Sequence, residues 1–262
     1  MTHMIFDVHT HLFQMHEGGR LDEVEIDTFI ARMDRCEIDR ALTLGPVTID
    51  PYPNEQLTRD FNTHTINAVE HAPDRLSGLC YLNPALDPQF NLEEMQRCVA
   101  DGPLVGVKFW IASLATNDAG HDPIMRRCAE LDCCVLYHAW YKTTGNEKEE
   151  STPADIAHLA RRHPNVRIIM AHMMGGGVRG ILDVAALENV WIDTSGSQAE
   201  AGIIEYALEA VGPERIIFGS DFPGRDFATQ LGKIEALDLT AEEHEAICWQ
   251  NTLDVLGRWA PC

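Results

Sequence analysis

His9 and His11 are the first residues of the chain whose type and spacing can do chemistry. They end an apolar, β-favouring stretch that begins at Ile5, so a strand is expected here. Side chains of a strand alternate between its two faces, which puts both imidazoles on one side, where they can chelate one metal ion. Two nearby histidines also occur by chance in many proteins. The metal interpretation therefore depends on further ligands later in the chain.

Later in the chain, polar residues again follow apolar runs directly. They are Lys108, His138, His172 and Asp221. Parallel strands covered on both faces are usually apolar throughout, so polar residues at their ends are informative. One histidine in such a place is more often a satisfied core residue than a ligand. Four histidines and an aspartate at matching strand ends argue against coincidence.

The elements that must position these residues alternate along the whole chain. Strands are predicted at 4–12, 40–45, 76–82, 104–110, 134–140, 166–172, 190–194 and 215–220. Helices are predicted at 25–36, 54–71, 88–100, from 122, from 153 to before 163, 178–187, 203–211, 226–237 and 241–256. Eight strands, each followed by a helix, predict an α/β protein with the (β/α)8 TIM-barrel fold.

An open, doubly wound sheet is the alternative fold. It usually carries a glycine-rich phosphate turn after its first strand, and His9-Thr10-His11 stands in that place here. Neither a linker nor a low-complexity segment interrupts the chain, so one domain over residues 1–262 is predicted. In such barrels the active site lies at the carboxyl ends of the strands, where the polar residues above are expected.

Composition narrows the classes of partner and compartment. The 262 residues are 45% hydrophobic, and the formal charge of −21 disfavours nucleic acid and anionic membranes as partners. No apolar run approaches the roughly 20 residues of a membrane span, and the N-terminus shows no signal-peptide pattern. A cytoplasmic protein with a small-molecule substrate is expected, with a homodimer compatible with the sequence. The 8 cysteines lack metal-binding spacing and are expected to be reduced thiols.

Several stretches together resemble the amidohydrolase superfamily, in its amidohydrolase-related branch, also called amidohydrolase family 2. The matching stretches are Phe6 to His11, Gly106-Val107-Lys108, Tyr137-His138, Ile169 to Gly176, Trp191 to Gly196, Ile217 to Pro223, Asn251-Thr252-Leu253 and Leu256-Gly257. The resemblance covers nearly the whole chain, and the set of motifs in this order is more specific than any one of them.

The resemblance implies a divalent metal, usually zinc, held by four residues: His9, His11, His138 and Asp221. It places His172 beside the ion, as a ligand or as the residue that orients the attacking water. Imidazoles and a carboxylate suit Zn²⁺, whose bound water has a pKa of about 7. Asp221 is then placed to accept the proton of that water and pass it to the leaving group.

Lys108 allows two interpretations. Some members of the superfamily carry a carbamylated lysine at this strand, bridging two metals. In the amidohydrolase-related branch, Gly-Val-Lys also occurs without that role, and the lysine can contact an anionic part of the substrate. One ion is favoured here, with Lys108 as a substrate-binding or electrostatic residue.

Residues just past the strand ends are candidates for the substrate wall. Trp110, Trp140 and Arg225 are predicted to bind substrate, Arg225 because a guanidinium pairs bidentately with a carboxylate. Phe13 and His16 are weaker candidates for the same wall. Asp7 is expected to make a supporting hydrogen bond rather than to bind metal. For Asp193, pocket lining and loop capping remain equally open.

The predicted function is a metal-dependent hydrolase that activates water against a small carbonyl substrate, such as a lactone, amide or ester. The alternative within the same family is a non-oxidative decarboxylase or hydratase acting on a small carboxylic acid. A barrel that binds metal or ligand without turnover is a third hypothesis. Asp221 argues against it, because simple binding needs no proton acceptor beside the metal.

Overall fold

Parallel strands form the centre of the protein in the computed structural model, which describes residues 4–12, 17–46, 52–112, 114–115, 118–197 and 200–261. Within these residues the strands are β1 (Phe6–Leu12), β2 (Arg40–Pro46), β3 (Leu76–Leu82), β4 (Gly106–Phe109), β5 (Cys134–Tyr137), β6 (Ile168–Met170), β7 (Val190–Asp193) and β8 (Ile216–Ile217). Each strand pairs in parallel with the next in the order β1 to β8.

Backbone hydrogen bonds close this sheet into a barrel. The N–H of Val8 donates to the carbonyl of Phe218 (3.0 Å), and the N–H of Asp221 donates to the carbonyl of His9 (2.7 Å). These bonds join β1 to the segment that begins with β8. The predicted (β/α)8 barrel is therefore confirmed, and the open doubly wound sheet is not the fold of this chain.

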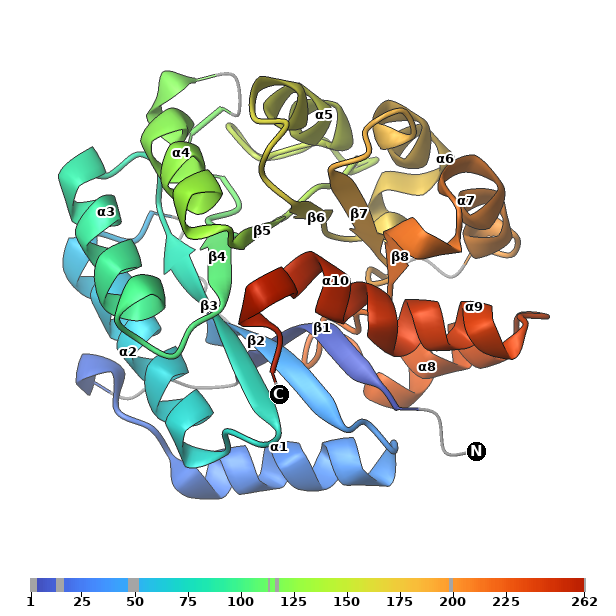
Figure 1. The fold of residues 1–262 in the computed structure, drawn as a ribbon, viewed down its shortest axis with the longest axis horizontal. Helices are drawn as coiled ribbons and strands as arrows, with labels where there is room; N and C mark the ends of the chain where they lie inside the picture. The colour runs from blue at the N-terminus through green and yellow to red at the C-terminus, as the bar shows by residue number, and fades with distance from the viewer. Residues whose placement is uncertain are drawn as a thin grey trace.

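Helices surround the strands (Figure 1). Among the described residues they are α1 (Glu23–Arg35), α2 (Glu55–His71), α3 (Pro88–Met95), α4 (Asp122–Leu131), α5 (Pro153–Arg162), α6 (Met173–Val184), α7 (Ile203–Val211), α8 (Phe227–Glu235), α9 (Ala241–Glu245) and α10 (Asn251–Leu256). The π-helical turns Gln96–Ala100 and Ala246–Gln250 follow α3 and α9, where the sequence predicted uninterrupted helices. Helix α10 lies across one end of the barrel, and its Val255 and Leu256 pack against the barrel interior (Figure 1).

Capping residues explain where several helices begin. The side chain of Asn54 accepts a hydrogen bond from the N–H of Leu57 (2.9 Å) at the start of α2. At α5, Thr152 and Asp155 form a capping box around Pro153. Each cap satisfies backbone N–H groups that have no partner inside the helix. This is why α2 and α5 start within one residue of their predicted positions.

The later strands end before the polar residues that follow them. β5, β6 and β8 end at Tyr137, Met170 and Ile217, two or three residues short of the predicted ends. His172 and Asp221 adopt left-handed backbone conformations, with φ of 68° and 63°. Such a conformation turns the chain out of the strand direction. The two side chains therefore leave the ladder at the carboxyl end of the barrel.

Helix α6 is assigned from Met173, but its backbone leaves helical geometry at Gly177 (φ 61°), directly before the predicted start at residue 178. Gly175 lies in the first turn of this helix. A Cβ there would lie 2.5 Å from Cδ2 of Trp140, so only glycine lets the indole seat on the helix. The first turn of α6 thus supports Trp140 instead of forming a loop.

The described cysteines are free, and no pair of them forms a disulfide. In the part of the chain that the structure describes, no helix combines the length and apolar character that a bilayer span requires.

Candidate metal centre

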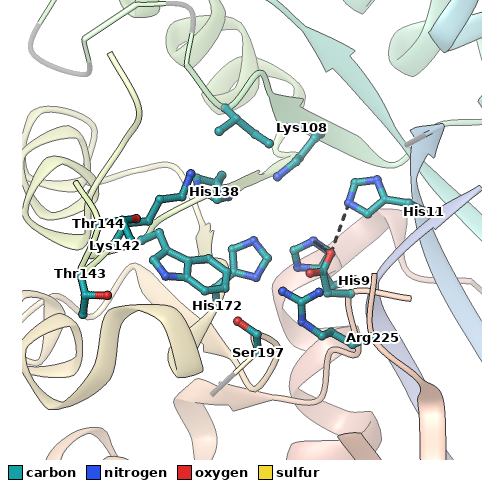
Figure 2. Close-up of a pocket in the computed structure, with 13 residues that line it drawn as sticks. His9, His11, Lys108, His138, Lys142, Thr143, Thr144, His172, Ser197 and Arg225 are labelled. Atoms are coloured by element: carbon teal, nitrogen blue, oxygen red, sulfur yellow. Dashed lines mark ion pairs between the residues drawn. The ribbon is translucent and has the colours of Figure 1, made fainter. Parts of the chain in front are cut away.

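A cavity of about 450 Å³ opens at the carboxyl ends of the strands. Its walls are His9, His11, Lys108, Ile111, His138, Trp140, Lys142, Thr143, Thr144, His172, Ser197, Asp221 and Arg225. All five residues of the predicted metal and catalytic set are among them. Figure 2 shows the labelled imidazoles, Lys108 and Arg225 arranged around a common space. The strand-end residues of separate strands therefore meet at one site, as the barrel fold requires.

Three donor groups converge on one point of this cavity. One nitrogen each of His9 and His11 and a carboxylate oxygen of Asp221 lie within 4.8 Å of one another. Oδ1 of Asp221 is 3.5 Å from Nε2 of His9 and 3.8 Å from Nε2 of His11. Two imidazole nitrogens and a carboxylate oxygen are a ligand set typical of zinc and related divalent ions.

His9 has one ring nitrogen bound and one facing the cluster. Its Nδ1 lies 2.7 Å from Oδ2 of Asp193, so the ring donates its proton there. Its Nε2 is buried and has no hydrogen-bond partner among the described residues. A buried polar atom without a partner costs free energy, and a metal ion would satisfy this one. The residues present therefore fit a divalent cation.

Asp193 at the end of β7 supports two of the histidines. Besides His9, its Oδ1 accepts hydrogen bonds from the backbone N–H of His172 (2.9 Å) and from the hydroxyl of Ser195 (2.5 Å). The Ser195 hydroxyl in turn lies 2.9 Å from Nδ1 of His172. Of the two open roles for Asp193, loop capping is observed, together with a positioning role that local sequence did not indicate.

His172 lies beside the cluster as expected. Its ring centroid is 4.8 Å from that of His9, and one of its ring nitrogens lies within 4.8 Å of a ring nitrogen of His9 and a carboxylate oxygen of Asp193. Because Asp193 already accepts the proton of His9, the cluster of His9, His11 and Asp221 is the better match to an ion. His172 can add a ligand or contact a bound water from this position.

His138 lines the same cavity but is held differently. Its Nε2 lies 2.9 Å from Oε1 of Glu150, and its ring centroid is 4.9 Å from that of His172. It is absent from the groups of converging donors that the described residues form. The resemblance implied His138 as a ligand, and the structure places it near the cluster with Nε2 already engaged.

Burial controls protonation in the cavity. It lowers the pKa of the His9, His11 and His172 imidazoles well below their usual value. These rings are therefore neutral at pH 7, the form that binds metal. Burial also raises the pKa of the Asp221 carboxyl to about 7, because a buried carboxylate loses its hydration.

Lys108 is fully enclosed at the end of β4. Its side chain points into the cavity (Figure 2), and burial lowers the pKa of its amine to about 8, against the opposing attraction of Asp193 and Asp221. A lysine with this pKa exists partly as a free amine near neutral pH. Its position therefore suits contact with an anionic substrate group and also the modification that a two-metal site needs.

The predicted substrate residues divide between the cavity and the core. Trp140 and Arg225 line the cavity, and the Trp140 ring lies 5.0 Å from that of His172. Trp110 does not line it: the indole is 4% exposed and packs edge-on against Tyr81. The prediction for Trp110 is corrected on this ground, because the chain turns at the end of β4 and buries the ring. Phe13 and His16 lie outside the described residues.

Three further residues complete the site, and the sequence indicated a role for only one of them. Asp7, on β1, accepts hydrogen bonds from the N–H groups of His9 and Ser220 (both 3.0 Å), the supporting role expected for it. Glu150 and Lys142, by contrast, lie between the predicted strand at 134–140 and the helix predicted from 153, and the sequence assigned them no role. An acidic residue that is buried in a loop cannot be distinguished from its exposed neighbours by sequence pattern.

Asp193→Asn is expected to weaken metal binding about 10- to 100-fold, the usual cost of losing a group that orients a ligand. The carboxylate accepts the Nδ1 proton of His9, which leaves Nε2 free for the ion; an amide that turns its NH₂ toward Nδ1 would move the proton to Nε2. Competition with a chromogenic chelator measures the affinity. Ser195→Ala, which removes one bond of the same network, should change it less. Equal affinities for wild type and Asp193→Asn would contradict this role.

The chain resembles known proteins at the level of family and fold. A family model described as Amidohydrolase matches residues 6–258. No curated protein sequence matches this chain significantly.

Solved structures share the barrel over almost its whole length. A dihydroxybenzoic acid decarboxylase from Polaromonas sp., with bound manganese and the inhibitor 2-nitroresorcinol, has a TM-score of 0.77 and 17% identity, covering 97% of each chain. A 5-carboxyvanillate decarboxylase from Novosphingobium aromaticivorans, complexed with manganese, has a TM-score of 0.76 and 16% identity, covering 97% of this chain and 96% of that one. A probable 2-pyrone-4,6-dicarboxylic acid hydrolase from Acinetobacter baumannii, with citric acid bound, has a TM-score of 0.65 and 18% identity, covering 97% and 99%. At these identities the likeness establishes the fold.

Proposed function

Because this chain belongs to the amidohydrolase family, we propose that it is a divalent-metal-dependent hydrolase acting on a small carbonyl substrate such as a lactone, amide or ester. One observation carries the proposal: the donor atoms of His9, His11 and Asp221 converge at the base of a cavity, and Nε2 of His9 has no other partner among the described residues. Zn²⁺ suits this donor set. Mn²⁺ is the second ion to test, because two proteins of similar fold bind manganese.

The bound ion would supply an acidified water with a pKa near 7 and polarise the substrate carbonyl. The side chains divide the remaining work. The carboxylate of Asp221 takes a proton from the attacking water and returns it to the leaving oxygen or nitrogen as the bond to the carbonyl carbon breaks. Its place between the rings of His9 and His11 puts it within reach of both events. His172 lies close enough to hold the water in line.

The cavity walls select the substrate. Lys108 and Arg225 offer positive charge to a carboxylate or to the developing oxyanion, and the Trp140 ring supplies an apolar wall. The whole chain has a formal charge of −21, so its surface is mostly negative. The basic residues make this cavity locally positive by comparison. We therefore place small, anionic carbonyl compounds first among the substrates.

Non-oxidative decarboxylation is the second candidate. The specific observation in its favour is the same pair of basic residues, Lys108 and Arg225, which suits a substrate bound through its carboxylate. Two proteins of similar fold are decarboxylases by name. In that reaction the bond between ring carbon and carboxylate breaks, CO₂ leaves, and a proton from Asp221 replaces it on carbon.

A metal assay joined to a substrate screen tests the proposal. We expect about one divalent ion per chain, and turnover of lactones, amides or esters measured by ring opening or release of the leaving group. Release of CO₂ from aromatic carboxylic acids without hydrolysis would instead identify the protein as a non-oxidative decarboxylase. A second stoichiometric ion with a carbamylated Lys108 would overturn the single-ion assignment. Metal binding without turnover of either substrate class would favour a binding protein.

A further inference from the structure

Glu150 is a buried acid at the wall of the cavity. It belongs to the loop between β5 and α5, and its side chain has no solvent exposure. Oε1 lies 2.9 Å from Nε2 of His138 and 2.9 Å from Nζ of Lys142. Oε2 accepts the backbone N–H of Glu147 at 2.8 Å. Both carboxylate oxygens are therefore used, and one of them contacts an imidazole of the candidate site.

The hydrogen-bond roles in this contact can be assigned. Lys142 Nζ and the Glu147 N–H can only donate, and both contact the Glu150 carboxyl, which is therefore the acceptor in these bonds. An ionised carboxylate can only accept. An imidazole that binds a cation is neutral and carries its one proton on the nitrogen that does not face the ion. That proton must lie on Nε2, and Nδ1 must carry a lone pair.

The backbone of the same loop holds His138 as well. The hydroxyl of Ser151 donates to the carbonyl of His138 at 2.5 Å, and the N–H of Trp140 donates to the carbonyl of Ser151 at 3.2 Å. Residues 150 and 151 therefore fix both the main chain and the ring of His138. A loop that makes these contacts controls the direction in which the ring presents its second nitrogen.

We propose that Glu150 is a positioning residue of this site: it fixes the Nε2–H tautomer and the ring plane of His138, so that Nδ1 serves as the nitrogen available to a bound divalent ion. The proposal rests on the proposed metal-dependent function and adds a residue to its machinery. It also explains why His138 lines the cavity although its Nε2 already contacts Glu150. Carboxylates commonly orient metal-binding histidines in this way.

Nitrogen-15 NMR of histidine-labelled full-length protein tests the tautomer without any substrate. In the metal-free wild type, we expect His138 to show a proton on Nε2 that exchanges slowly and resonates downfield, as a bond to a carboxylate produces. Glu150→Ala should lose this protected proton. Glu150→Gln, whose amide oxygen still accepts, should keep it with a smaller downfield shift. A wild-type His138 protonated on Nδ1 would overturn the proposal.

Zinc affinity, measured by chelator competition, is the second readout. We expect Glu150→Ala to bind Zn²⁺ about 10- to 100-fold more weakly, and Glu150→Gln to recover most of that loss. Glu147→Ala is the matched control: it removes the same charge from an exposed side chain of the same loop and keeps its backbone N–H. Unchanged affinity in Glu150→Ala would overturn the proposal. Neither readout uses turnover, so a failed substrate screen would refute the proposed function and leave this inference standing.

Discussion

Asp221→Asn is expected to keep a bound divalent ion and to lower kcat about 10²- to 10⁴-fold, the range that general acid–base groups contribute. The amide of asparagine cannot take up and return a proton, whereas the imidazoles of His9, His11 and His172 still face the cavity. The backbone should tolerate the change, since Asp221 has a φ of 63° and asparagine favours the same left-handed region. Metal content and steady-state kinetics on the same preparation measure the two effects.

Asp238→Asn is the matched control for this variant. It makes the same chemical change at an exposed position outside the cavity and should leave both kcat and metal content at wild-type values. Excess metal in the assay separates a loss of ion from a loss of proton transfer. Near-normal turnover of Asp221→Asn would remove Asp221 from the proton-transfer role.

Removing the metal is expected to reduce activity about a thousandfold or more, since a metal ion contributes several kcal/mol of transition-state stabilisation. Without the ion, the buried Nε2 of His9 has no hydrogen-bond partner among the described residues. The barrel should remain folded, because its apolar interior does not include the cluster. Its melting temperature should fall, because an ion that binds only the folded state stabilises it.

Dialysis against a chelator, followed by separate additions of Zn²⁺ and Mn²⁺, measures this effect. Recovery of activity with one of the two ions would identify the metal that the site uses. Circular dichroism of the stripped protein controls for unfolding. A stripped protein that retains full activity with no detectable ion would contradict a metal-dependent function.

Much of the fold could be predicted from local signals. β3 and α7 have the predicted bounds, because Asn83-Pro84 and Gly212-Pro213 are strong stop signals that act within a few residues. The ends of β6 and β8 were harder to predict. There the backbone leaves the ladder to turn His172 and Asp221 toward the cavity, and no short-range signal marks such a departure.

The candidate ligands were also accessible from sequence, because a polar residue directly after an apolar run is a local pattern. His9, His11, His172 and Asp221 meet as that pattern and the barrel fold together predicted. Trp110 shows the limit of the same reasoning. Being next to a strand end does not determine whether a side chain turns toward the cavity or, as here, toward Phe61 and Tyr81 in the core.

Local sequence patterns were enough to predict the order of the elements, the closed barrel and the end of the barrel at which histidines and carboxylates gather. How those groups are held depends on contacts between residues far apart in the chain. His9 is oriented by Asp193, 184 residues away in the chain, and His138 by an acid that local pattern could not separate from its exposed neighbours. The physical reason is that strand and helix propensities act over a few residues, whereas the proton on a buried imidazole is placed by whichever acceptor folding brings against it.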